Sequence, residues 1–206
     1  LTDLWNFSAT EPKVPADNKI KDTLPTIDYS NIHIHDTTVS LENPNTWLDL
    51  GAIAKGYIAD RLSDYLIKQG VTSGIVNLGG NIVTIGTKED GSKWSIGLEA
   101  PYSDRQEMIG GIQMENMTVV TSGTYERYIE EDGRKYHHIL NPTTGYPVDS
   151  DIISVSILSK QGNSDKTPGF AYFSDNIRNG IAGSNVDGQG YIWGVTSKDS
   201  DVSKLT

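Results

Sequence analysis

The sequence predicts an α+β fold with a largely antiparallel sheet and few helices. Many short segments have strand character, whereas only two stretches show helical spacing or a helix stop signal. A hairpin signal, Asp132-Gly133, lies between two strand-like runs, which favours antiparallel pairing. Strands grouped in this way, without a regular strand–helix alternation, are typical of the α+β class.

The N-terminal region contains turns, a short helix and two strands. Residues 11–30 hold three prolines and several Asp, Asn and Ser residues, which are turn signals. Within this region "ADNKIKDTLP" predicts one short helix that ends before Pro25. "NIHIHD" and "TVSLEN" predict two short strands joined by Asp36 and Thr37.

The apolar pattern of the long helix runs from Tyr57 onward. Its apolar positions Ile58, Leu62, Tyr65 and Leu66 follow helical spacing, and Gly70 stands where a C-terminal cap is expected. "GIVNLGGNIVTIG" then predicts a buried strand interrupted by a glycine pair. The remaining predictions are strands at "WSIGLE", "TVVTSG" and "IISVSIL", and a hairpin in "ERYIEEDGRKYHHI".

The composition limits the organisation and the partners. A chain of 206 residues is enough for one domain with an appendage. We place a first domain at 1–160 and a Gly-, Asn- and Ser-rich segment at 161–206, expected to be a loop-heavy subdomain or an edge hairpin. The net charge of −10 argues against a nucleic acid partner, and the absence of cysteine excludes thiolate metal sites. The chain opens without Met, so we expect a mature or trimmed piece.

The stretch "LDLGAIAKGYIADRL" carries the first candidate site. Gly51, Ala52 and Ala54 leave the start of a helix free of bulky side chains. Lys55, expected in the first turn, adds a positive charge where a phosphate would be favourable, and Asp49 can accept hydrogen bonds. The alternative is a closely packed strand-to-helix turn with Lys55 solvated.

Two further segments carry polar candidates. In "VNLGGNI" the pair Gly79 and Gly80 predicts a bulge or the close approach of a ligand, with Asn77 and Asn81 beside it. A bulge that serves packing alone is equally consistent. "TSG" at 121–123 makes a small strand end that is rich in hydroxyl groups.

The histidines come in two pairs. His137 and His138 are adjacent, so in a strand they face opposite sides and one of them can point into a site. His33 and His35 share one strand face, but no third metal ligand is near them, which favours a solvent-facing pair.

Five blocks together resemble the ApbE family, the FAD:protein FMN transferases. They are "DLGAIAKGYIADRL", "GIVNLGGNI", "WSIGLEAP", "VVTSGTYERY" and "YHHILNPTTGYPV", in the family's order. The resemblance implies a T-fold-like α+β domain that binds FAD. It also implies a Mg²⁺-dependent reaction in which a threonine of an acceptor protein attacks FAD, AMP leaves and FMN stays attached by a phosphoester. Some members also hydrolyse FAD to FMN and AMP.

The resemblance assigns roles to particular residues. Asp49 and Lys55 match FAD contacts, and Ala52 matches a position whose carbonyl binds the metal. The remaining cofactor contacts that it implies are Asn77, Gly79, Gly80, Thr121, Ser122, Gly123, His138 and Ile139. We expect His138 to be the general base.

The sequence also departs from the family pattern. Asn81 and Thr124 stand where the family shows Asp, and the family's Asp-rich helix is replaced by "SKQGNSDKTPGFAY", where Asp165 and Thr167 are the local substitutes as metal ligands. The family's N-terminal third has no counterpart before Leu1. The sequence is consistent with an incomplete chain, a C-terminal segment of other origin or a different metal site. The alternative function is therefore a catalytically silent FAD-binding module. By resemblance the full protein is extracytoplasmic, as a membrane-anchored lipoprotein.

Overall fold

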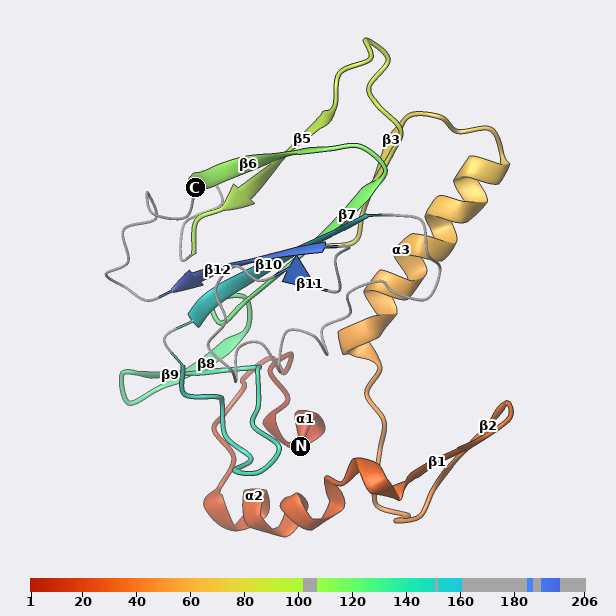
Figure 1. Ribbon diagram of the computed structural model, residues 1–206. Helices are drawn as coiled ribbons and strands as arrows, with labels where there is room; N and C mark the ends of the chain where they lie inside the picture. Colours follow the sequence, from red (N-terminus) through yellow and green to blue (C-terminus); the bar gives the residue numbers. More distant parts are fainter. Residues whose placement is uncertain (102–106, 151, 161–184, 187–189, 197–206) are drawn as a thin grey trace. The chain divides into compact units, whose positions relative to one another are not determined.

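The computed structural model describes residues 1–101, 107–150, 152–160, 185–186 and 190–196, which fall into two units (Figure 1). Unit 1 comprises Leu1–Asp49 and Glu126–Asp149. Unit 2 comprises the described residues of Leu50–Tyr125 and Ser150–Thr206. Each unit is described by itself.

Unit 1 combines short helices with two hairpins, as the turn-rich sequence predicts. Its elements are α1 (Thr2–Trp5), α2 (Asp17–Thr23), 3-10 turns at Leu24–Thr26 and Tyr29–Asn31, β1 (Ile32–His35), β2 (Thr38–Leu41), β8 (Tyr128–Glu131) and β9 (Arg134–His137). The short helix before Pro25 is confirmed. So are the two hairpins, β1–β2 and β8–β9, in which Asp36, Asp132 and Gly133 adopt positive φ at the turns.

The core of unit 1 forms around Trp5. Trp5, Ile20 and Ile129 are buried together, and the Trp5 indole N–H donates to the carbonyl oxygen of Gly145 at 2.8 Å. A buried indole needs such a partner, since an unpaired N–H would be costly. This bond ties the N-terminal helix to the turn that follows the two adjacent histidines.

Unit 2 is built on a six-stranded antiparallel sheet. Its elements are α3 (Gly51–Lys68), β3 (Gly74–Asn77), β4 (Asn81–Ile85), β5 (Trp94–Glu99), β6 (Met108–Met114), β7 (Met117–Gly123), β10 (Ile152–Lys160), β11 (Asn185–Val186) and β12 (Gly190–Thr196). The strand order is β11-β12-β10-β7-β4-β3, and every neighbouring pair is antiparallel. The α+β prediction is confirmed, and among the described strands β11 and β3 lie at the two edges of the sheet.

Different elements cover the two faces of this sheet. Ala59 of α3 packs with Val76 and Val83 on one face. Thr118 pairs with Val83, so the next residue, Val119, points to the other face, where it packs against the β5–β6 hairpin. Unit 2 is therefore layered as helix, sheet and hairpin (Figure 1).

Helix α3 exists as predicted, but its buried face differs from the one that the apolar spacing indicates. It begins at Gly51, where the sequence places a bare helix start. Its buried residues are Gly56, Ala59 and Ser63, which recur at helical spacing on one side. Most of the apolar stripe points elsewhere, since Ile58 and Tyr65 are exposed, whereas Leu66 packs against the buried cluster. Small residues let the helix lie close to the sheet, and hydrophobicity alone did not reveal this choice of face.

The C-terminal end of α3 matches the prediction at Gly70. Gly70 has φ +91°, its N–H donates to the Ile67 carbonyl, and the Val71 N–H donates to the Leu66 carbonyl. This pair of bonds is the Schellman arrangement, which satisfies the last carbonyls of a helix. In the part of the chain that the structure describes, no helix is both long enough and apolar enough to cross a membrane.

The glycine pair 79–80 corrects a second prediction. Instead of a bulge inside one strand, Gly79 and Gly80 form the turn between β3 and β4. Their φ values are +63° and +86°, and the Leu78 N–H donates to the Asn81 carbonyl across the turn. Positive φ at both central residues is typical of a tight two-residue hairpin.

Candidate functional site

The first polar cluster in unit 2 joins α3 to the glycine turn. The Lys55 ammonium donates to the carbonyl oxygen of Gly79 at 3.0 Å. Lys55 is the fifth residue of α3, one position beyond the first turn in which it was predicted. Its side chain is exposed, and the ammonium carries three protons, of which this bond uses one. The lysine is therefore fixed in place and still has donors for an anion.

The glycine turn needs both of its glycines. The Asn77 side-chain oxygen accepts the Gly79 N–H at 3.0 Å, which holds the turn from within. The Thr121 N–H donates to the Gly80 carbonyl at 2.9 Å, and a Cβ on Gly80 would stand 3.2 Å from the Thr121 carbonyl oxygen. The bare backbone thus lets the turn lie against β7. Asn77, predicted as a cofactor contact, uses its oxygen inside the turn.

Strand register decides which side chains share a face with α3. Asn81 pairs with Val120 and follows the alternation that puts Val83 under α3, so its side chain lies on the helix side. Ser122 lies on that side as well, whereas Thr121 points to the opposite face. There the Thr121 hydroxyl is hydrogen-bonded to the Ser156 hydroxyl at 2.8 Å. The "TSG" group is therefore divided between two faces.

Asn81 is the anomaly of this cluster. Its side chain is buried, only 3% exposed, and its amide oxygen has no hydrogen-bond partner among the residues that the structure describes. Leaving a buried polar atom unpaired costs about 1–3 kcal/mol, so such an atom calls for an explanation. A ligand N–H or O–H donor at this position would remove the cost.

The second polar cluster lies in unit 1, at His138. Its backbone N–H and its Nδ1 both lie against the carbonyl oxygen of Arg127, at 3.0 and 3.1 Å. A carbonyl only accepts, so Nδ1 carries the proton and Nε2 holds the lone pair of the neutral ring. Burial lowers the pKa of His138, with the Arg127 carbonyl acting in the opposite direction. The Phe7 ring stands edge-on to the imidazole at 6.3 Å.

His137 contrasts with its neighbour. Its Nε2 donates to the Val148 carbonyl at 3.1 Å, and its Nδ1 accepts the Ile139 N–H at 3.3 Å. Both nitrogens therefore serve the local fold, and burial lowers the pKa of this ring as well. Of the two adjacent histidines, His137 holds the structure together, as the sequence allowed for one of them.

Comparison with known proteins identifies the family. A family model described as the ApbE family matches residues 1–167. The chain belongs to the ApbE family. An FAD:protein FMN transferase of Klebsiella pneumoniae (strain 342) is 45% identical over 161 residues, which are 77% of this chain and 49% of that protein. One from Treponema pallidum (strain Nichols) is 36% identical over 171 residues, 76% of this chain and 47% of that protein.

Solved ApbE structures share the fold. The ApbE protein of Thermotoga maritima superimposes with a TM-score of 0.74 at 33% identity, over 86% of this chain and 58% of that one. The Pseudomonas stutzeri flavinyl transferase ApbE, in its apo form, gives 0.68 at 29% identity, over 96% and 64%. The chain spans about half the length of the curated relatives that it matches.

The other positions that ApbE membership singles out lie as follows. Asp49 is exposed and is the last residue of the first segment of unit 1, whereas Ala52 is exposed in the first turn of α3. Ile139 is buried, and its carbonyl accepts the Val148 N–H. Gly123 is buried at the end of β7, where an added Cβ would overlap the Tyr125 ring. Their roles as ligand contacts stay predictions.

The metal ligands of the ApbE pattern are not gathered in the described residues. Across the ranges that the structure describes, no three His, Cys, Asp or Glu side chains come close enough to hold a metal ion. Asp165 and Thr167 lie outside the described residues. Mg²⁺ favours several oxygen ligands in octahedral geometry, and the Ala52 carbonyl alone does not supply them.

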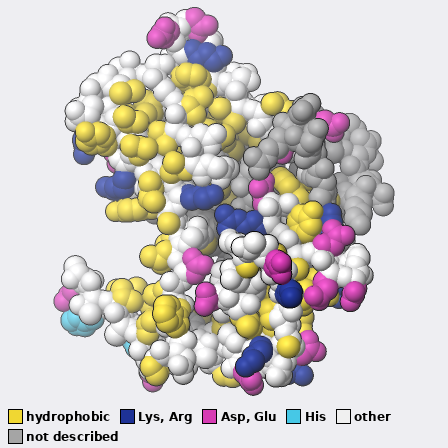
Figure 2. All heavy atoms as spheres, turned by 180° about the vertical axis from the view of Figure 1, so that it is seen from behind, with side chains coloured by type: hydrophobic (Ala, Val, Ile, Leu, Met, Phe, Trp, Pro, Cys, Tyr) yellow, Lys and Arg dark blue, Asp and Glu magenta, His cyan; other side chains and the backbone are white. Residues whose placement is uncertain are grey.

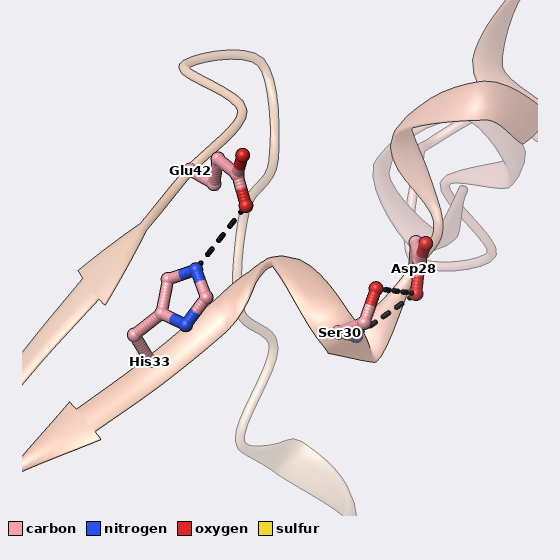
Figure 3. A network of polar contacts seen from close by, with 4 residues as sticks. All are labelled: Asp28, Ser30, His33 and Glu42. Atoms are coloured by element: carbon pink, nitrogen blue, oxygen red, sulfur yellow. Dashed lines mark hydrogen bonds and ion pairs between the residues drawn. The ribbon is translucent and has the colours of Figure 1, made fainter.

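The other histidine pair does not form a metal site either. The exposed His33 pairs with Glu42 at 3.2 Å, as Figure 3 shows beside the turn in which Asp28 caps Ser30. His35 pairs with the neighbouring Asp36 at 3.3 Å. Each histidine thus has its own carboxylate, and the predicted solvent-facing pair is confirmed.

Two residues that form hydrogen bonds with candidate site residues were not predicted from the sequence. Arg127 holds His138 through a backbone carbonyl, for which no side-chain pattern gives a signal. Ser156 pairs with Thr121, and its signal was present: Ser154 and Ser156 alternate in a strand that is otherwise apolar.

Proposed function

We propose that this chain is part of an FAD:protein FMN transferase. It transfers FMN from FAD to a threonine of an acceptor protein as a phosphoester and releases AMP. The relatives named FAD:protein FMN transferase support the assignment at the level of the reaction, since two of them are 45% and 36% identical to this chain. The threonine acceptor and the release of AMP rest on the family resemblance.

The observation that carries the proposal is the contact of Lys55 with the glycine turn. The bond to Gly79 holds a cation beside a backbone that lacks side chains, so a bulky anion can approach it. Phosphoryl transfer is catalysed mainly by positioning and by charge neutralisation. A fixed ammonium of this kind suits one phosphate of the FAD diphosphate.

We assign the proton acceptor to His138. The acceptor hydroxyl must lose a proton as its oxygen attacks phosphorus. The Arg127 carbonyl fixes the tautomer with the proton on Nδ1 and the lone pair on Nε2, and burial keeps the ring neutral at neutral pH. His137 is unsuited to this role, because both of its ring nitrogens are engaged.

The magnesium dependence is part of the proposal. The described residues do not fit a complete Mg²⁺ site, so we derive no step through the ion. The candidate ligands are Asp165, Thr167 and the Ala52 carbonyl, and Mg²⁺ would supply charge neutralisation at the diphosphate. Localisation outside the cytoplasm, with a lipid anchor in the full-length protein, also remains a proposal that membrane fractionation tests.

The test combines the purified chain, FAD, Mg²⁺ and an acceptor domain that carries a family-type threonine site. We expect the mass of one FMN to be added to the acceptor and an equivalent of AMP to appear. Lys55→Ala should suppress both, whereas Lys68→Ala, at the far end of the same helix, should not. No mass gain when Mg²⁺ occupancy and FAD binding are demonstrated would overturn the proposal.

A catalytically silent FAD-binding module is the second candidate. The absence of a carboxylate cluster among the described residues favours it. Calorimetry separates the two candidates, because a silent module should bind FAD equally well with Mg²⁺ and with a chelator. A third outcome, AMP release without an acceptor, would indicate FAD hydrolysis to FMN and AMP.

A further inference from the structure

The segment that follows His138 is held at its tip by the N-terminal part of unit 1. Residues 139–148 fold back on themselves, so that the N–H of the last residue donates to the carbonyl of the first at 2.9 Å. At the tip of this loop 139–148, the Trp5 indole N–H donates to the Gly145 carbonyl at 2.8 Å. Trp5 is only 1% exposed, so water hardly competes for the bond. The indole therefore fixes the tip of a loop whose base adjoins His138.

Further contacts hold the tip of the loop against the same part of the chain. The Tyr146 hydroxyl donates to the Asp17 carboxylate, and the Tyr146 ring stands edge-on to Trp5, with 6.0 Å between the centroids. Gly145 has φ +78°, where a side chain is strained, and an added Cβ would stand 2.3 Å from the Ile20 side chain. The tip thus lies directly on the core of unit 1, and Trp5 contacts it with its ring as well as with its N–H.

Trp5 also reaches the imidazole of His138 through Phe7. The Trp5 and Phe7 rings are stacked, with 5.5 Å between their centroids and 1° between their planes. The Phe7 ring in turn stands at 76° to the His138 imidazole, with 6.3 Å between the centroids. Stacked and edge-on arrangements are the favourable geometries of aromatic pairs. The three rings form a row, so a change at Trp5 moves the ring against which His138 lies.

The surroundings of His138 differ from those of the surface histidines. His33 and His35, on the β1–β2 hairpin, have side chains that are 58% and 93% exposed, and Figure 2 shows cyan side chains at the surface of this hairpin. His138 is half-buried, and its Nδ1 lies 3.1 Å from the Arg127 carbonyl oxygen. One hydrogen bond fixes the tautomer but lets an imidazole pivot about the bonded nitrogen. A packed ring restricts that pivot, and the ring that packs on His138 leads back to Trp5.

We propose that Trp5 is a positioning residue for the proton transfer that we assign to His138. The inference rests on the proposed function, in which His138 accepts the proton of the attacking hydroxyl. An apolar side chain at position 5 would fill the core, but it would leave the Gly145 carbonyl without this donor and the loop tip without its tie. The imidazole would then sample more orientations, and fewer of them would direct its lone pair toward the hydroxyl.

The experiment replaces Trp5 by benzothienylalanine, which keeps the shape of tryptophan and has sulfur in place of the N–H. The same replacement of Trp94 is the matched control, because its indole N–H donates to the Ile85 carbonyl at 3.4 Å, in unit 2. Nitrogen NMR of the imidazoles, on the chain without FAD, should show the His138 resonances moving away from those of the Nδ1–H tautomer in the Trp5 variant only. Single-turnover FMN transfer should slow about 10-fold in that variant, with an unchanged half-saturating concentration of FAD.

Two results would overturn the inference. Parental His138 resonances in a folded Trp5 variant do so whatever the transfer rate, because a loss of stability alone does not act through the imidazole. Shifted resonances with a parental rate do so as well, since the orientation of the ring then does not matter to the reaction. If the parent chain transfers no FMN, the proposed function fails, and the resonances alone decide whether Trp5 orients His138. If the Trp5 variant does not fold, Phe7→Leu decides, because it keeps the bond to Gly145 and interrupts the row of rings. Parental resonances and rate in that variant then overturn the inference.

Discussion

The two polar clusters use their backbones in opposite ways. At the glycine turn of unit 2, the backbone supplies the geometry and a carbonyl for the lysine, while the exposed side chain of Lys55 keeps spare donors. At the histidine turn of unit 1, backbone carbonyls instead accept hydrogen bonds from side-chain N–H groups, one on His138 and one on His137. Residue type alone therefore does not make a lysine or a histidine a candidate for ligand binding or catalysis. Its role also depends on which of its side-chain atoms are bonded to the local backbone.

The largest effect should separate the two histidines. His138→Gln should lower FMN transfer by about 10²–10⁴-fold, because it removes the proton acceptor that we propose. His137→Gln should leave the rate near that of the parent and destabilise the fold by about 1–3 kcal/mol, because Val148 and Ile139 lose a hydrogen-bond partner. Acceptor mass under single-turnover conditions and urea unfolding measure the two effects. A similar rate loss in both variants would erase the distinction between them.

The second-largest effect is expected on stability, when either glycine of the turn is replaced, and it should differ between the two positions. Gly80→Ala places a Cβ 3.2 Å from the Thr121 carbonyl at a positive φ, and should cost about 2–4 kcal/mol in the free energy of unfolding. Gly79→Ala has the same backbone strain, but its Cβ would make an ordinary 3.6 Å contact with the Lys55 ammonium, so about 1–2 kcal/mol is expected. Urea denaturation ranks them; equal losses would show that the contact with β7 adds nothing to the strain.

Helix ends and hairpin turns were predictable from sequence, because only a few neighbouring residues determine them. Pro25 fixed the end of α2, Asp132-Gly133 marked the β8–β9 turn, and Gly70 marked the end of α3. Glycine pairs were ambiguous: 79–80 form a turn, whereas 110–111 lie inside β6, a strand that the sequence analysis did not predict. In both cases strand pairing with distant segments decides the conformation.

The faces of elements were not predictable. The apolar spacing of Ile58 and Tyr65 suggested a buried stripe, but the sheet accepts the small residues Gly56 and Ala59. At the candidate site, Lys55 and the glycine pair were predicted as contacts of the same ligand. In the structure, the Lys55 ammonium is hydrogen-bonded to the Gly79 carbonyl. The Arg127 carbonyl could not be foreseen, because every residue carries a carbonyl and only the fold selects one.

Removal of the Lys55 charge comes third in size. Lys55→Ala should weaken FAD binding about 10–100-fold, the equivalent of a charge-assisted hydrogen bond worth about 1.5–3 kcal/mol. Added salt should shrink this difference, since the side chain is exposed. Lys68→Ala, in the last turn of α3, provides the matched control. Calorimetry with FAD gives both affinities, and equal values for the two variants would leave the turn without a role in phosphate binding.

The fourth prediction concerns the buried amide oxygen of Asn81, which follows the glycine turn. Asn81→Leu has a similar volume and removes the unpaired amide oxygen, so the free protein should become more stable by up to about 1–3 kcal/mol. FAD binding should weaken if a ligand donor pairs with that oxygen. Thermal melts with and without FAD measure both quantities. A stability gain with unchanged FAD binding would show that the unpaired oxygen destabilises the fold and does not contact FAD.

The smallest effect concerns pH and the surroundings of His138. Burial lowers the folded-state pKa of His137 and of His138 below the ordinary 6.5, so the unfolded chain binds more protons between the two values. The free energy of unfolding should therefore be highest above pH 6.5 and should fall as the pH drops through the folded pKa values. Phe7→Leu, which removes the aromatic ring whose centroid lies 6.3 Å from that of the His138 imidazole, should raise the pKa of His138 more than that of His137. NMR titration of the two imidazoles follows each residue separately. Equal shifts would mean that the aromatic ring does not set the environment of His138, and its neutrality would then rest on the remaining burial.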